Sequence, residues 1–144
     1  MGRRRVGKTV MIYHAVEKLL SEGICPTNIL YLSIDMPIYT DLALEKIVNI
    51  FQGEFEHGRD VKLFIIFDEI QYLSEWEVHL KSLVDSYPSY KYVATGSLKL
   101  KSRESGAGRF TDFILPALTF AEYIYFISGD AKDINKESLI KRFA

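Results

Sequence analysis

Residues 2–9 read GRRRVGKT and match the pattern G-x-x-x-x-G-K-[ST]. In this pattern the glycines let backbone N–H groups turn toward phosphate oxygens, and the following helix points the positive end of its dipole at them. Apolar residues at helical spacing do follow, from Ile12 to Leu20, and Gly23 ends the predicted helix. The stretch predicts a phosphate-binding loop (P-loop) on a helix N-terminus. The alternative is a basic, flexible segment before a helix.

The side chains of this loop have separate expected roles. Lys8 is expected to reach the β- and γ-phosphates of a nucleotide, and the Thr9 hydroxyl is expected to bind Mg²⁺. We therefore expect ATP and Mg²⁺ as cofactors. The residues expected to bind the nucleotide are Gly2, Arg5, Val6, Gly7, Lys8, Thr9 and Val10.

Outward from the loop, helical and strand-like patterns alternate along the chain. The predicted strands are residues 28–34, 62–67, 90–94 and 110–115, and the predicted helices are residues 12–22, 41–55, 74–87, 119–127 and 133–143. Ser74 with Glu77 three residues later resembles a capping box at one helix start. The alternation predicts an α/β fold, in which a parallel sheet lies between helices and the ligand binds at the carboxyl ends of the strands.

Two adjacent acidic residues follow the apolar run KLFIIF of residues 62–67. Side chains alternate along a strand and change direction at its end, so Asp68 and Glu69 can take different roles. Asp68 is expected to hold Mg²⁺, and Glu69 is expected to orient and deprotonate the attacking water. The alternative is a solvated acidic pair at a helix entry.

Polar residues also follow the next predicted strand, in the run Ala94-Thr95-Gly96-Ser97. Thr95, in preference to Ser97, is expected to hydrogen-bond the attacking water or the γ-phosphate; the alternative is a simple turn. Arg109, in the run GAGR, is expected to act on the γ-phosphate bound by a neighbouring subunit. A surface position is the alternative for Arg109, and Arg103 is then the second candidate.

Composition narrows the remaining classes of function. The 144 residues suffice for one domain, and 18 Lys and Arg residues oppose 19 Asp and Glu residues. The net charge of −1 does not indicate nucleic acid, although a basic loop leaves it as a possible partner. A single cysteine, Cys25, excludes an internal disulfide and fits a reducing, cytoplasmic location. The longest apolar-leaning run, 113–127, is too short to cross a bilayer, so we expect no membrane partner.

Longer stretches of the sequence resemble a known family. The segments GRRRVGKT, IIFDEIQYLSEWEVHLKSLVD, VATGS, ESGAGRF and LPALTFAEY are similar to prokaryotic AAA-type (AAA+) ATPases that carry a C-terminal domain of unknown function. The resemblance runs from Gly2 to about Phe126. It implies a P-loop NTPase fold of the additional-strand class, with strand order 5-1-4-3-2. It also implies that Thr95 matches sensor 1 and that Arg109 matches the arginine before the last strand.

Met1 directly precedes the P-loop, which leaves no room for the central strand that leads into this motif in the family. We therefore expect residues 1–128 to form a truncated ATPase core and residues 129–144 to form a helix that starts a lid or linker. The expected function is Mg²⁺-dependent ATP hydrolysis by a motor or switch module. The expected partners are ATP and either further copies of the chain or a protein that supplies the missing elements. The alternative is a non-catalytic nucleotide-binding or protein-interaction module.

Overall fold

The computed structural model describes residues 7–39, 42–58 and 60–97, together with the single positions 111, 115, 116, 119 and 122. In this part the chain order is α1 (Lys8–Ser21), η1 (Pro26–Asn28), β1 (Ile29–Ser33), η2 (Pro37–Tyr39), α2 (Leu44–Glu54), β2 (Phe64–Asp68), η3 (Ile70–Tyr72), α3 (Trp76–Ser86) and β3 (Lys91–Ala94), where η marks a short 3₁₀ helix. The predicted α/β class is confirmed. The predicted elements 110–115, 119–127 and 133–143 and the division at residue 128 fall outside the continuously described ranges.

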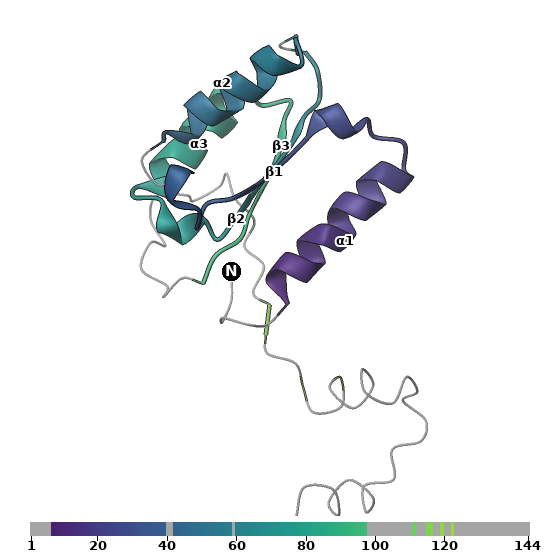
Figure 1. Cartoon of the computed structure of the whole chain (residues 1–144), viewed down its shortest axis with the longest axis vertical. Coiled ribbons are helices and arrows are strands. Elements are labelled where there is room, and N and C mark those ends of the chain that lie inside the picture. The colour runs from purple at the N-terminus through teal and green to yellow at the C-terminus, as the bar shows by residue number, and fades with distance from the viewer. Residues whose placement is uncertain are drawn as a thin grey trace, which may run out of the picture.

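The three described strands form one parallel sheet in the order β1-β2-β3. Helices α2 and α3 cover one face of the sheet, and α1 lies on the other face (Figure 1). The central position of β2 agrees with its nearly unbroken apolar run, because a strand that is covered on both faces is buried along its whole length.

The main core lies between the sheet and the pair α2–α3. Alternate residues of β2, Ile65 and Phe67, point into it and are fully buried. Helices α2 and α3 supply the opposite side through Leu44, Ile47, Val48, Trp76, Leu80 and Leu83. The buried residues of α2 lie near its start, whereas Phe55, just beyond the helix end, is 44% exposed.

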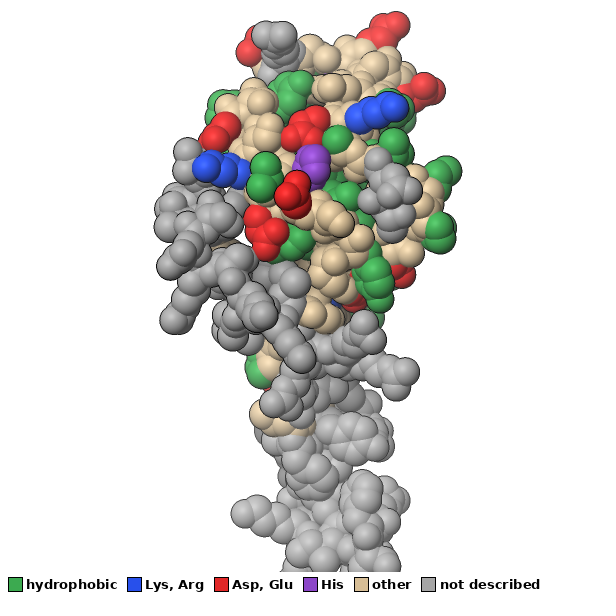
Figure 2. Space-filling view, turned by 90° about the vertical axis from the view of Figure 1, so that its left-hand side faces the viewer, with side chains coloured by type: hydrophobic (Ala, Val, Ile, Leu, Met, Phe, Trp, Pro, Cys, Tyr) green, Lys and Arg blue, Asp and Glu red, His purple; other side chains and the backbone are tan. Residues whose placement is uncertain are grey.

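Charged side chains on the outer face of α2 and α3 are mixed in sign. His79 Nδ1 lies 3.0 Å from Glu45 Oε2, which links α3 to α2 at the surface. Acidic side chains of the described residues outnumber basic ones over this face, and the basic ones lie apart from each other (Figure 2).

The predicted capping box at Ser74 and Glu77 is wrong. Helix α3 begins at Trp76, and its N-cap residue Glu75 adopts the left-handed conformation with φ 52° and no side-chain cap hydrogen bond. This turn at Glu75 places Ser74 one residue too early to accept from the first amides of the helix. Thr119 and Glu122 do make reciprocal hydrogen bonds: the Thr119 N–H donates to Glu122 Oε2 over 2.7 Å, and the Thr119 hydroxyl accepts from the Glu122 N–H over 3.3 Å.

Helix α1 is attached to the sheet over a small part of its surface. Of its residues only Lys8 and Ile12 are buried, while Val10, Met11 and Tyr13 are each about half exposed. Across the described ranges, none of the helices combines the length and the apolarity that a bilayer crossing requires.

Two isoleucines test the position of the core. Ile65 is fully buried in β2, and Ile50 on α2 is 60% exposed. We expect Ile65→Ala to lower the free energy of unfolding by about 2–5 kcal/mol, because it removes buried methyl groups and leaves a cavity. Ile50→Ala should change it by less than about 0.5 kcal/mol. Urea denaturation of both variants checks this, and similar losses in both would contradict the described core.

Candidate functional site

The register of the strands brings polar residues together at one edge of the sheet. Ser33 of β1 pairs with Asp68 of β2, and Phe67 pairs with Ala94, so Thr95 follows directly beside Asp68. The Thr95 N–H donates to the Phe67 carbonyl over 2.8 Å, which continues the parallel pairing by one residue. Asp68 therefore points to the face opposite Phe67, which is the face that α1 covers.

The N-terminus of α1 lies at the same edge. Gly7, the N-cap residue, has φ 86°, a left-handed conformation that glycine adopts without a steric penalty. Lys8 and Thr9 follow in the first turn, and the Lys8 side chain is only 6% exposed. The Thr9 hydroxyl donates to Asp68 Oδ2 over 2.7 Å. The two residues predicted to bind Mg²⁺ are thus in direct contact across 59 positions of sequence.

Asp68 is 1% exposed and accepts hydrogen bonds from several donors. Oδ2 accepts from the Thr9 hydroxyl and from Tyr31 Oη, the latter over 3.3 Å. Oδ1 accepts from the Glu69 N–H over 3.0 Å and from the Thr95 hydroxyl in a short contact. Four donors from four places in the chain fix the orientation of this carboxylate and stabilise its negative charge.

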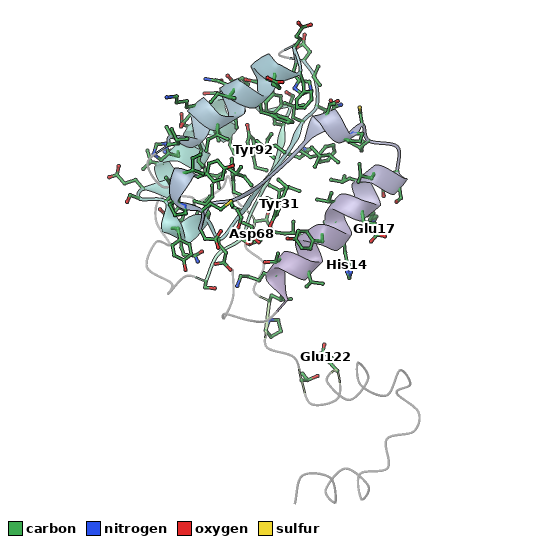
Figure 3. All side chains as sticks on the ribbon, in the orientation of Figure 1. His14, Glu17, Tyr31, Asp68, Tyr92 and Glu122 are labelled. Atoms are coloured by element: carbon green, nitrogen blue, oxygen red, sulfur yellow. The ribbon has the colours of Figure 1, made fainter. Side chains whose placement is uncertain are left out.

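Tyr31 is a site residue that sequence reasoning did not identify. It lies on β1, two residues before Ser33, and its ring packs edge-on against Tyr13 of α1 with the ring centroids 5.5 Å apart. Figure 3 shows Tyr31 and Asp68 on the side of the sheet that faces α1. Burial, followed by the neighbouring Tyr13 hydroxyl and the Asp68 carboxylate, raises the pKa of Tyr31 well above its usual value, so the phenol stays protonated and can donate.

Glu69 leaves the direction of β2. Its φ of 53° and ψ of 42° are left-handed, and it is the residue that precedes η3. Its side chain is 26% exposed, and Oε1 lies 3.9 Å from Lys8 Nζ. The other carboxylate oxygen accepts a short hydrogen bond from Gln71 Nε2. The unusual backbone thus gives two adjacent acids different surroundings, one buried beside Thr9 and one at the surface beside Lys8.

The two polar residues after β3 contact different parts of the site. Thr95 is 6% exposed and donates to the predicted metal-binding carboxylate of Asp68. Ser97 Oγ accepts from Lys8 Nζ over 3.0 Å. The structure brings both residues to the site, and the roles predicted for them in hydrolysis stay predictions.

The remaining predicted site residues are not all at this edge. Val10 lies in the first turns of α1 but is 55% exposed. Gly2, Arg5, Val6, Arg103 and Arg109 fall outside the described residues.

Among the described residues, no group of three or more His, Cys, Asp or Glu side chains could hold a metal ion by itself. Mg²⁺ in nucleotide sites needs only one or two protein oxygens, because phosphate and water supply the rest at about 2.0–2.1 Å. The Thr9 hydroxyl and the Asp68 carboxylate are oxygen donors of the kind that Mg²⁺ prefers, and they lie in contact at 2.7 Å, so these two residues would fit such a site.

The three-stranded parallel sheet and the helices on both of its faces are consistent with a P-loop NTPase-like fold. A family model described as an AAA domain matches residues 1–124. The chain therefore belongs to this family of AAA domains, which are nucleotide-binding modules.

Two relatives are similar to this chain, and both are described as uncharacterized. An uncharacterized protein of Methanocaldococcus jannaschii is 33% identical over 146 aligned positions, which cover 97% of this chain and 29% of the relative. An uncharacterized protein of Haemophilus influenzae is 25% identical over 141 positions, which cover 95% of this chain and 34% of that protein. The chain thus spans about a third of the length of the curated relatives it matches. No solved structure matches it.

The left-handed backbone conformation of Glu69 can be tested by the free energy of unfolding of variants at this position. We expect Glu69→Gly to be more stable than Glu69→Ala by about 1 kcal/mol, because a left-handed alanine costs roughly 1–2 kcal/mol and the greater freedom of unfolded glycine offsets only part of it. Glu77, in the first turn of α3, is the control, since there glycine should be less stable than alanine by up to about 1 kcal/mol. Urea denaturation measures both pairs, and the same sign at both positions would contradict the left-handed backbone.

Proposed function

We propose that this chain binds ATP with Mg²⁺ at the N-terminus of α1 and hydrolyses it with Glu69 as the general base. The observation that carries the proposal is the contact between Thr9 and Asp68, which joins the P-loop motif to the end of the central strand. A basic, flexible N-terminal segment would not require this contact, nor would a solvated acidic pair.

Lys8 is the proposed phosphate-binding side chain. Its side chain is almost fully buried, and its Nζ atom lies 3.0 Å from Ser97 Oγ and 3.9 Å from Glu69 Oε1. A buried ammonium gains most from an anion with which it makes charge-assisted hydrogen bonds. The first backbone amides of α1 have no acceptor within the helix and would bind the same anion, with the helix dipole in support.

Thr9 and Asp68 are the residues that would hold Mg²⁺. When bound, this ion neutralises charge on the phosphates and on the reacting oxygens. Tyr31 and Thr95 donate to Asp68 and keep its carboxylate oriented toward Thr9. One hydroxyl lies on β1 and the other directly after β3, so the orientation of Asp68 depends on the sheet and not on α1 alone.

Glu69 is proposed to accept the proton of the attacking water. Its carboxylate stands at the entrance of the site beside Lys8 and, unlike that of Asp68, is partly open to solvent. Burial separates the two acids: the covered one suits a fixed metal ligand, and the partly exposed one suits proton exchange with water. The competing function is a module that binds nucleotide without hydrolysing it. A measurement of ATP turnover separates a hydrolysing module from a module that only binds.

Assembly belongs to the proposal as well. AAA domains often act as oligomers, and Arg109 would then act on the phosphate bound by a neighbouring copy. The two relatives are about three times as long as this chain, so their activity, substrates and partners concern a longer protein than this domain.

Two lysines of α1 test the phosphate site. We expect Lys8→Ala to weaken binding of ATP with Mg²⁺ about ten- to a hundredfold, because charge-assisted hydrogen bonds to phosphate are lost. Lys18 is 76% exposed and pairs only with Glu22 at 3.8 Å among the contacts described, so Lys18→Ala should bind ATP normally. Titration calorimetry on both variants gives the answer, and equal affinities would refute the phosphate assignment.

Two glutamates test the general base. We expect Glu69→Gln to bind ATP with little change and to lower turnover by roughly 10² to 10⁴, the usual contribution of a positioned base. Glu17→Gln is the control, since Glu17 lies on the outer side of α1 (Figure 3). Phosphate release measures turnover. Full turnover by Glu69→Gln would remove Glu69 as the base, and none by the unaltered protein would favour the non-catalytic module.

A further inference from the structure

Gln71 lies beside the proposed general base and makes two side-chain hydrogen bonds. It is part of η3, two residues after Glu69, and it is half-buried. Its Nε2 donates a short hydrogen bond to Glu69 Oε2. Its Oε1 accepts from the Ser97 N–H over 3.1 Å. One side chain therefore links the proposed base to the loop that follows β3.

The chemistry of the two partners fixes the orientation of the Gln71 amide. An ionised carboxylate only accepts hydrogen bonds, and a backbone N–H only donates. The amide must therefore turn its nitrogen toward Glu69 and its oxygen toward Ser97. The reverse orientation would lose both bonds, so the two contacts support each other.

These contacts belong to a closed ring of four residues. Lys8 Nζ donates to Ser97 Oγ, the Ser97 N–H donates to Gln71, Gln71 donates to Glu69, and Glu69 lies 3.9 Å from Lys8. The ring joins α1, the end of β2, η3 and the loop after β3. A displacement of Lys8 toward a phosphate would therefore change its contacts with Ser97 and with Glu69, which are the two hydrogen-bond partners of Gln71.

Gly96 makes room for this arrangement. A Cβ atom built on Gly96 would meet Gln71 Oε1 at 2.7 Å, which is closer than a real Cβ contact. The next nearest atom outside Gln71 is Ile70 Cγ2 at 3.6 Å, an ordinary contact. A methyl group at Gly96 would thus act mainly on the amide of Gln71.

We propose that Gln71 is a positioning residue that aims the Glu69 carboxylate at the attacking water and ties it to the loop of residues 95–97. The proposal rests on the proposed function. A partly exposed glutamate has three rotatable bonds, so without a fixed donor its carboxylate would spread over several orientations. The bond from Gln71 holds one oxygen and leaves the other directed to the Lys8 side of the site. Orientation of this kind contributes to the rate and not to substrate binding.

Gln71→Ala and Gln71→Glu test the positioning role in the whole chain. We expect both variants to lower turnover of ATP about ten- to a hundredfold while the dissociation constant for ATP with Mg²⁺ changes less than about twofold. Gln71→Glu keeps the shape and the acceptor for Ser97 but removes the donor to Glu69. Gln52→Ala is the control. Gln52 lies on α2 and hydrogen-bonds the Tyr90 hydroxyl, so its loss should leave turnover unchanged. Melting temperatures confirm that each variant is folded.

Gly96→Ala gives a second, independent perturbation of the same side chain. It should lower turnover in the unaltered protein, and it should have no further effect in the Gln71→Ala background, where the clash is absent. Full turnover in both Gln71 variants, or equal effects of Gly96→Ala in both backgrounds, would overturn the role of Gln71. Absence of turnover in the unaltered protein would instead overturn the proposed function, and the role of Gln71 with it.

Discussion

The hydrogen bond from Thr9 to Asp68 joins α1 to the carboxyl edge of the sheet. Helix α1 buries only two of its residues, so apolar packing alone attaches it weakly. The polar contacts of its first turn, Thr9 with Asp68 and Lys8 with Ser97, add attachment points at the end where a phosphate would bind. The position of the N-terminus of α1 relative to Asp68 and Glu69 therefore depends on these contacts.

The second constraint is the change of backbone direction at Glu69. Had the strand continued, Glu69 would have pointed into the apolar core between the sheet and the pair α2–α3, because side chains alternate along a strand. The left-handed conformation turns it out to the edge of the sheet instead. The partial exposure of Glu69 beside the buried Asp68 follows from this one pair of dihedral angles, and so does the short path from Glu69 to Gln71.

Much of the fold could be predicted from the sequence, because alternating periodicity was sufficient for the α/β class. Motif spacing was sufficient to predict that Lys8, Thr9, Asp68 and Glu69 lie together, whereas their roles stay predictions. Tyr31 and Gln71 could not be predicted, since their partners depend on strand register and on the left-handed turn, which leave no local pattern. The same cause explains the wrong capping box: the left-handed Glu75 moved the helix start past Ser74.

The small buried surface of α1 also has a thermodynamic consequence. Undocking of α1 exposes little apolar area, so it is among the least costly local openings of the described domain. An undocked helix carries Lys8 and Thr9 away from Asp68 and abolishes the binding-competent state. Apparent affinity for any ligand at this end is then the intrinsic affinity multiplied by the docked fraction. Substitutions on the sheet-facing side of α1, remote from the ligand, would change the apparent affinity only by changing the fraction of molecules in which α1 is docked.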